Sequence, residues 1–247
     1  MNLNRDGTIF INKQGSKCLV VQYISAGEVY VRFENTDCLI KTRWEYCKDG
    51  SQLENPFLPT LYKVGYVGYG RYKSTHRAYR TWVSILQRCY CTKTHQKHPS
   101  YKDCEVCEEW HNFQNFAKWY DENYYEVKGE KTQIDKDILI KGNKIYSPDK
   151  CLFVPQKINL LFVKGSGGSH LPIGVGECKR TGKYIARLRK NGTYVTVGRY
   201  DNPCEAFLAY KKEKEEYIRE MALTYKQLIP TKVYEAVINY KIEINDK

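Results

Sequence analysis

The stretch that most constrains the fold of this chain is Gln133–Asn159, QIDKDILIKGNKIYSPDKCLFVPQKIN. Its first run, Ile134–Ile138, combines apolar and acidic residues and is interpreted as a strand. A turn is predicted at Lys141–Asn143, because glycine and asparagine tolerate positive φ at little cost. A second apolar run, Cys151–Val154, leads to Pro155, which suits the first position of a helix because its missing N–H has no partner there. The stretch therefore predicts strand, loop, strand and helix, in that order.

The length and charge of the chain narrow the classes of protein to which it can belong. With 247 residues, two or three small domains are expected. The net charge of +12 favours a polyanionic partner, of which nucleic acid is the commonest, although a merely solubilising surface stays open. No apolar run approaches the length of a membrane span, and the opening residues, MNLNRDGTIF, lack the apolar block of a signal peptide. We therefore expect a cytoplasmic protein with no membrane partner, and no pattern in the sequence demands an obligate protein partner.

Residues 1–70 are predicted to form a small all-β unit followed by an ordered linker. Runs of β-branched and aromatic residues at Thr8–Ile11, Cys18–Tyr23 and Glu28–Phe33 are typical of strands, and turn residues separate them. In the third run alternate residues are apolar, as one buried face requires. A small barrel or curled sheet is expected, and its role in DNA contact, packing or partner binding stays open.

The central part of the chain, residues 71–162, is predicted to contain two helices before the Gln133–Asn159 stretch. Over residues 75–93 one apolar face recurs with helical period, and it consists of Tyr79, Trp82, Val83, Leu86, Cys89 and Tyr90. A polar loop is expected to extend from there to about Tyr101. A second helix is predicted over Asn112–Asn123, with its aromatic residues on one side.

A Gly/Ser-rich linker at residues 163–172 predicts a boundary, and residues 173–247 are expected to form a separate domain. Asn191-Gly192 is a strong hairpin signal between two strands, and Ile173–Cys178 adds a third strand. Asn202-Pro203 predicts a helix start, with Asn as the cap and Pro at the first position. The predicted fold class is α+β: a small N-terminal β unit, a central strand–strand–helix domain with further helices, and a C-terminal three-stranded sheet with a helix.

Two sets of residues carry a family resemblance. One set consists of the Gln133–Asn159 stretch preceded by Trp82, Arg88-Cys89, Cys104, Cys107-Glu108, Trp110, Phe113 and Phe116. It covers roughly residues 75–162 and resembles the HNH module of phage homing endonucleases, which implies a ββα-metal domain and a protein of the host cytoplasm. The other set consists of Gly174-Val175, Lys183-Tyr184-x-Ala186, Val197–Asp201 and Glu205-Ala206-x2-Ala209-Tyr210. It is similar to the AP2 DNA-binding domain that such endonucleases often carry.

The predicted C-terminal sheet is strongly basic on one face. Residues 173–200 hold seven Lys and Arg residues against one acidic residue, Glu177. Alternation along the strands is expected to separate an inner face from an open face. The inner face, toward the helix, would hold Tyr184, Ala186, Leu188, Val195 and Val197, and the open face Ile185, Arg187, Arg189, Tyr194 and Thr196.

An open sheet face of this composition can enter the major groove of DNA. Arginine there pairs bidentately with guanine, and threonine or tyrosine meets thymine methyl groups or phosphates. The resemblance to AP2 domains implies base and backbone contacts, which fall on Arg187, Arg189, Tyr194 and Thr196, and Lys183 is added as a further DNA-binding cation. The competing interpretation is an ordinary solvated sheet face.

In the central domain, the HNH resemblance implies a metal-dependent nuclease site. Asp135 matches the strand carboxylate of the family and Asn159 its helix ligand for Mg²⁺ or a similar divalent ion, and Asn143 matches a loop residue that buttresses the site. Lys136 stands at the position of the general-base histidine. An unperturbed lysine is protonated at neutral pH and cannot accept a proton. Lys136 could instead bind the phosphate and leave the role of base to His95, His98 or His111, so an active and a degenerate site both stay open.

Four cysteines raise the question of a structural zinc ion. Cys104-x2-Cys107 has the spacing of zinc ligands, and Cys89 and Cys151 could complete a four-cysteine site. The other interpretation is that these are small buried thiols packed under the neighbouring tryptophans.

The sequence leaves three functions to be compared. The first is a DNA-binding endonuclease of the phage HNH type, which selects its site on double-stranded DNA with the AP2-like domain and nicks or cuts it with a divalent metal ion. The second is a non-catalytic DNA-binding or regulatory protein that keeps the HNH scaffold, and Lys136 is the residue that separates the two. The third is an RNA-binding protein, on the basis of the basic and tyrosine-rich composition.

Overall fold

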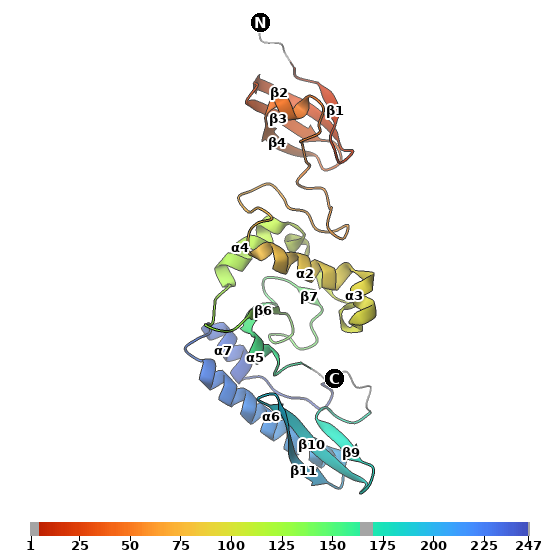
Figure 1. Cartoon of the computed structure of the whole chain (residues 1–247), viewed down its shortest axis with the longest axis vertical. Helices are drawn as coiled ribbons and strands as arrows, with labels where there is room; N and C mark the ends of the chain where they lie inside the picture. Colours follow the sequence, from red (N-terminus) through yellow and green to blue (C-terminus); the bar gives the residue numbers. More distant parts are fainter. Residues whose placement is uncertain (1–4, 164–169, 247) are drawn as a thin grey trace. The chain divides into compact units, whose positions relative to one another are not determined.

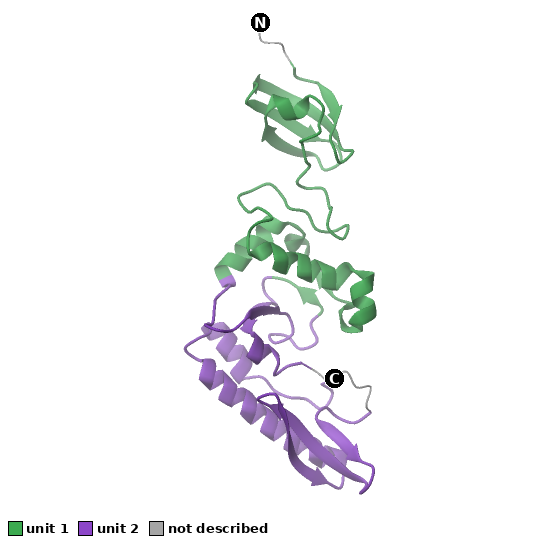
Figure 2. Ribbon diagram, viewed as in Figure 1, with its two compact units in different colours: residues 1–122, 144–147 green, residues 123–143, 148–247 purple. Residues whose placement is uncertain are grey.

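The computed structural model describes residues 5–163 and 170–246. The chain is a mixture of helices and strands, in agreement with the predicted α+β class (Figure 1). It divides into two compact units, one of residues 1–122 and 144–147 and the other of residues 123–143 and 148–247 (Figure 2). The predicted Gly/Ser linker lies largely outside the described residues. Within the described ranges, none of the helices has the length and apolar character needed to cross a membrane.

This division differs from the domain boundaries expected from the sequence. The segment predicted as one domain, residues 71–162, contributes to both units, and the first unit also includes the N-terminal sheet. Residues 144–147 belong to the first unit because β7 (Ile145–Tyr146) pairs in parallel with β5 (Glu105–Val106). Such a pairing between segments far apart in the sequence has no local signal.

The N-terminal part of the first unit is a four-stranded antiparallel sheet with strands in sequence order. Its strands are β1 (Ile9–Ile11), β2 (Lys17–Ser25), β3 (Glu28–Phe33) and β4 (Cys38–Thr42). The predicted alternation in β3 is confirmed, because Val29, Val31 and Phe33 are fully buried. The prediction of an all-β unit is wrong in one detail, since a one-turn helix, α1 (Trp44–Cys47), follows β4 and packs on the same core.

The rest of the first unit is built around buried aromatic residues of α2 (Ala78–Tyr90) and α4 (Phe113–Asn123). Trp82 of α2 donates its indole N–H to the carbonyl of Trp110, at 2.7 Å, within the one-turn helix η2 (Glu108–His111). The predicted helix over residues 75–93 is shorter than expected because Cys91 has extended backbone angles, which end α2. The predicted polar loop after it is also wrong, since it contains α3 (Thr92–Lys97) and η1 (Pro99–Tyr101).

The second unit begins with the predicted strand–strand–helix order. β6 (Thr132–Asp135) pairs antiparallel with β8 (Leu152–Pro155), and α5 (Gln156–Asn159) follows directly. The predicted strand does not continue to Ile138, because the Asp135 carboxylate accepts hydrogen bonds from the backbone N–H groups of Asp137 and Ile138 and turns the chain. Pro155 was expected at the first position of the helix, but it is the last residue of β8 and occupies the N-cap position of α5.

The second unit ends with a three-stranded antiparallel sheet and two helices. The strands are β9 (Val175–Cys178), β10 (Lys183–Lys190) and β11 (Thr193–Tyr200), with β10 in the middle. Asn191 and Gly192 have positive φ, as the predicted hairpin requires. The Asn202 side chain accepts from the Glu205 N–H at 2.8 Å and caps α6 (Pro203–Tyr225), which confirms the predicted helix start. The last helix is α7 (Thr231–Ile238).

Candidate nucleic-acid interface

The C-terminal sheet has one covered face and one open face. α6 packs on the covered face, where Ala186 and Leu188 of β10 are buried with Ala206, Phe207 and Tyr210 of the helix (Figure 1). The other face presents exposed polar side chains from β10 and β11. A sheet that is apolar on one side and polar on the other needs no further partner to fold, so its open face is available for a ligand.

Four of the five residues predicted on the open face are exposed and lie next to one another across the hairpin. Arg187 stands opposite Thr196, and Arg189 stands opposite Tyr194. Residues directly opposite in an antiparallel pair have Cβ atoms about 4.5–5.5 Å apart, so these side chains share a single patch. Tyr194 is 74% exposed, which is unusual for a tyrosine. The Arg189 Nε donates to the Gly192 carbonyl at 2.9 Å, which fixes this guanidinium at the tip of the hairpin.

A β-bulge in β11 changes the predicted alternation. Ala186 pairs with Gly198 and Arg187 with Thr196, so Val197 is the extra residue. Val197 still packs on the core as predicted. Val195 stands opposite the buried Leu188, on the inner face as predicted, but it is 41% exposed. Ile185 was expected to be open and is only 5% exposed, which is a second correction. The bulge is a property of the pairing with β10 and therefore has no reliable signal in the sequence of β11 alone.

The bulge brings a further arginine to the open face. Arg199 is exposed and stands opposite Ile185, which lies two residues from Arg187 on the same side of β10. Sequence reasoning did not assign Arg199 to the interface, because strict alternation of side chains assigns the residues beyond a bulge to the wrong face of the sheet. Its position within residues 173–200, which hold seven Lys and Arg residues against one acidic residue, is the signal that could have indicated it.

Lys183, the remaining predicted DNA-binding residue, is placed differently from the arginines. It is exposed at the start of β10, and its Nζ lies 2.9 Å from the Asp201 carboxylate. The ion pair is solvent-exposed and therefore worth little, so a phosphate can compete with Asp201 for this ammonium group. Lys183 is thus a peripheral cation of the interface rather than a part of the central patch.

The strand–strand–helix segment brings together the residues predicted for the nuclease site. Asn159 of α5 donates from Nδ2 to the Gln133 Oε1 at 2.9 Å. Gln133 and Asp135 are two residues apart on β6, so their side chains point to the same face of the strand. Asn159 approaches this face. Gln133 is a residue that sequence reasoning missed, and its contact with Asn159 could not be read from the pattern.

Asp135 is held mainly by the backbone. Its Oδ1 accepts from the N–H groups of Asp137 and Ile138, both at 2.8 Å. Burial raises the pKa of the Asp135 carboxyl above its ordinary value, against the opposing effect of these two hydrogen bonds. Among the described residues no hydrogen bond is assigned to Oδ2. That oxygen is therefore available to coordinate a metal ion or to accept a hydrogen bond from a ligand.

Lys136 is a buried structural residue. It is 7% exposed, and its Nζ donates to the Asn143 carbonyl at 2.6 Å and to the Asp137 Oδ2 at 2.7 Å. In return the Asn143 side chain donates to the Lys136 carbonyl at 2.9 Å. The two residues therefore close the loop between β6 and β8. An ammonium group that donates to two protein oxygens is a poor base and a poor phosphate ligand.

The histidines considered as alternative bases are engaged within the first unit. The His95 Nε2 lies 2.9 Å from the Arg88 carbonyl, and the His111 Nε2 lies 3.0 Å from the Val106 carbonyl. The His98 ring contacts the Tyr101 ring edge-on. The imidazoles of His95 and His111 each lie within hydrogen-bond distance of a nearby backbone carbonyl. These contacts connect local backbone segments and give no support to a role of either histidine as a base.

The predicted zinc ligands do not form a recognisable metal centre. Cys89, Cys104 and Cys151 are buried and Cys107 is half-buried. In the parts of the chain that are described, no three His, Cys, Asp or Glu residues are grouped to hold a metal ion. Cys89 and Cys104 are buried, as are Trp82 and Trp110, which fits the interpretation of small packed thiols.

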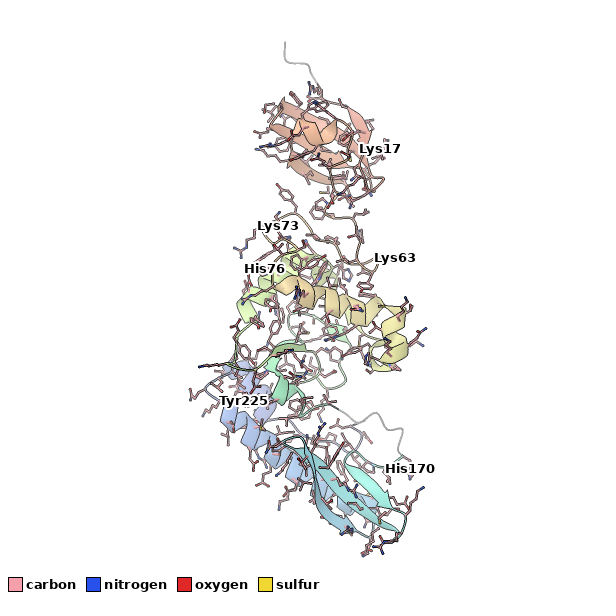
Figure 3. All side chains as sticks on the ribbon, viewed as in Figure 1. Lys17, Lys63, Lys73, His76, His170 and Tyr225 are labelled. Carbon is pink, nitrogen blue, oxygen red and sulfur yellow. The ribbon has the colours of Figure 1, made fainter. Side chains whose placement is uncertain are left out.

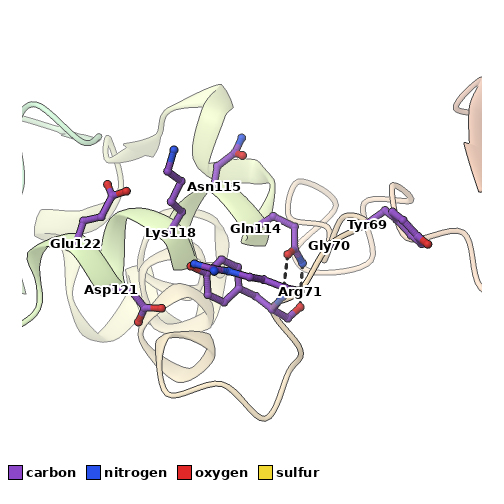
Figure 4. Close-up of a pocket in the computed structure, with 9 residues that line it drawn as sticks. Tyr69, Gly70, Arg71, Gln114, Asn115, Lys118, Asp121 and Glu122 are labelled. Atoms are coloured by element: carbon purple, nitrogen blue, oxygen red, sulfur yellow. Dashed lines mark hydrogen bonds between the residues drawn. The ribbon is translucent and has the colours of Figure 1, made fainter.

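A pocket of about 400 Å³ lies beside α4 in the first unit. Gln114 closes one side of it by donating to the carbonyls of Val67 and Tyr72, at 2.9 Å each, and accepting from the Tyr72 N–H at 3.0 Å (Figure 4). The remaining wall combines cations and carboxylates, namely Arg71, Lys118, Asp121 and Glu122. This mixture of charge suits neither a polyanion nor an apolar ligand, and we assign the pocket no ligand.

Comparison of the chain with models of protein families, with curated proteins and with solved structures finds no significant match.

Proposed function

We propose that this chain is a DNA-binding protein that recognises duplex DNA through the open face of its C-terminal sheet. The observation that carries the proposal is the exposed patch on β10 and β11, where three arginines, a tyrosine and a threonine lie together. The surrounding sheet is basic, with one acidic residue among residues 173–200. A polyanion is the ligand class that such a surface attracts.

Shape supports duplex DNA over other polyanions. The major groove of B-DNA admits a narrow antiparallel β-ribbon, and the end of the β10–β11 hairpin that extends beyond the pairing with β9, residues 187–196, has this form, with α6 on the side of the sheet away from the patch. Arg187 and Arg199 can each pair bidentately with a guanine, and the methyl group of Thr196 suits a thymine. Tyr194 and Lys183 are positioned at the periphery, where phosphate contacts fix the register.

The proposal is tested by selecting a preferred duplex from a randomised pool with the full chain and then measuring affinity for variants. Arg187→Ala is expected to weaken binding to the preferred duplex by about 1–3 kcal/mol more than binding to random duplex. Arg219→Ala is the matched control, because Arg219 is an exposed arginine of α6 and its removal changes the net charge equally. An equal loss on both duplexes would assign Arg187 to a phosphate contact, and no loss at all would contradict the proposed interface.

A second candidate function is metal-dependent hydrolysis of the DNA backbone in the β6–β8–α5 segment. The observation in its favour is that Asp135 and Asn159 approach the same face of β6. Their oxygens fit Mg²⁺, which keeps several waters and needs only one or two protein carboxylates. A divalent ion bound there would stabilise charge on the scissile phosphate and the leaving oxygen. The chain's own contribution would be to hold these two oxygens, through the β6 backbone and Gln133.

The environment of Lys136 favours the non-catalytic DNA-binding protein over this second candidate. Its ammonium group donates to two oxygens of its own loop, so the position that should activate water holds a cation with a structural task. We expect the wild-type chain to bind supercoiled plasmid without nicking it in Mg²⁺ or Mn²⁺. Metal-dependent nicking that Asp135→Asn removes, while binding persists, would instead establish the nuclease.

A further inference from the structure

The positive charge of the chain is concentrated in a segment that the proposed interface does not use. Residues 55–102 contain nine Lys and Arg residues and no Asp or Glu. This fifth of the chain therefore carries +9 of the net charge of +12. The segment comprises the loop before α2, α2 itself, α3 and η1, all of them in the first unit.

Four of these nine cations are held at the surface by the pattern of α2 and α3. In α2 the buried residues lie on one side, and Arg77, Arg80, Ser84 and Gln87 recur at the spacing of the opposite, polar side. Lys93 and Lys97, one turn apart, are exposed on α3. Arg88 is the exception, because its guanidinium lies 5.6 Å from the Tyr101 ring and donates to the Tyr146 hydroxyl.

Carboxylates neutralise little of this charge. Asp121 lies 3.4 Å from His76 and 3.6 Å from Arg77, at the start of α2. Among the residues described, no salt bridge is found for Arg80, Lys93 or Lys97. The neutral residues between them, such as Ser84, Gln87 and Thr92, are hydrogen-bond donors of the kind that contact phosphate oxygens.

The loop before α2 extends the basic surface in a fixed conformation. Gln114 ties the loop at Val67 and Tyr72, and a Cβ atom added at Gly70 would lie 2.4 Å from the Gln114 Oε1 (Figure 4). This close approach positions Tyr69, which is 63% exposed, and Arg71 beside it. Lys63 and Lys73 are exposed on the same loop (Figure 3).

We infer that these cations form a second nucleic-acid surface, which binds the phosphates of duplex DNA without reading sequence. We define the α2–α3 basic surface by Lys73, Arg80, Lys93 and Lys97. α2 alone is about 20 Å long at 1.5 Å per residue, which spans several phosphates of one strand. The cations of this surface are not placed in cross-strand register as the residues of the sheet patch are, and they provide point charges for phosphates. The inference goes beyond the proposed function, since it needs no residue of the C-terminal sheet.

The experiment measures how binding of the full chain to a random-sequence duplex depends on salt. Each phosphate contact contributes about −0.9 to the slope of log K against log salt concentration. The variant Arg80→Ala/Lys93→Ala/Lys97→Ala is therefore expected to make the slope shallower by about 2–3. Exposed substitutions of this kind are expected to leave folding intact, which a thermal melt checks.

The matched control removes the same net charge from the N-terminal sheet of the same unit. It is Lys13→Ala/Lys17→Ala/Arg32→Ala, in which each cation is paired with a carboxylate. The control is expected to change the slope by less than about 1. An unchanged slope in the Arg80/Lys93/Lys97 variant overturns the inference. A loss confined to duplex RNA or to phosphatidylserine vesicles overturns it as well.

The outcome of this experiment does not depend on whether the sheet interface binds DNA. The α2–α3 basic surface is expected to affect random and preferred duplexes equally, whereas Arg187→Ala is expected to change the ratio between them. If Arg187→Ala leaves that ratio unchanged while the slope falls as expected, the proposed sheet interface fails and the second surface stands. The reverse pattern overturns the second surface alone.

Discussion

At the scale of single residues, Asp135 and Lys136 are neighbours in sequence with different tasks. Asp135 ends β6 by accepting two backbone N–H groups, and its burial raises the carboxyl pKa. Lys136 closes the following loop through the Asn143 carbonyl and the Asp137 carboxylate. A buried ammonium group is stable only when it is paired and hydrogen-bonded, and these contacts meet that requirement. The pair therefore explains the shape of the loop without any ligand.

Gly174 gives a stability prediction at the same scale. Its φ is +76°, and a Cβ atom there would lie 2.2 Å from the Tyr210 ring. Gly174→Ala combines backbone strain with a clash against a buried aromatic ring, so we expect a loss of about 2–4 kcal/mol in the free energy of unfolding. Urea denaturation followed by circular dichroism measures it.

The neighbouring glycine provides the control for this prediction. Gly176 lies on β9, two residues away, and a Cβ atom added there meets nothing within 4 Å. Gly176→Ala is therefore expected to stay within about 0.5 kcal/mol of the wild type. Equal stability of the two variants would show that α6 does not pack against the start of β9 as described.

At the scale of elements, the sequence predicts what depends on local patterns. The hairpin at Asn191-Gly192, the cap at Asn202 and the apolar faces of α2 and α4 all have local signals, and the structure contains each of them. α3 was missed because a short polar helix has no apolar period. The early end of β6 had a usable signal, since aspartate often bonds the backbone N–H two residues ahead.

The residues of the candidate interface could be predicted from local alternation only as far as the bulge in β11. Arg187, Arg189, Tyr194 and Thr196 could be placed on one face because alternation holds up to the bulge. Beyond the bulge, the face of Arg199 depends on which residue of β11 is left unpaired. That choice is made by packing across the sheet and on α6, which no local pattern in β11 encodes.

At the scale of the whole molecule, two compact units carry two different basic surfaces. We propose that the sheet patch of the second unit, with its arginines in cross-strand register, recognises base edges. The exposed cations of the α2–α3 basic surface in the first unit have no such register and would bind phosphates. These two proposals together predict a division of tasks between reading and holding DNA, and this division would account for the concentration of charge in residues 55–102.

The most direct test of the central claim locates the arginines that DNA covers. The full chain is treated with phenylglyoxal, which modifies arginine, in the presence and absence of saturating duplex DNA, and each site is quantified by mass spectrometry. We predict that Arg187, Arg189 and Arg199 lose reactivity when DNA is bound, while Arg219 on α6 and Arg32 on the N-terminal sheet retain it. Full reactivity of the three sheet arginines at saturating DNA would contradict the account.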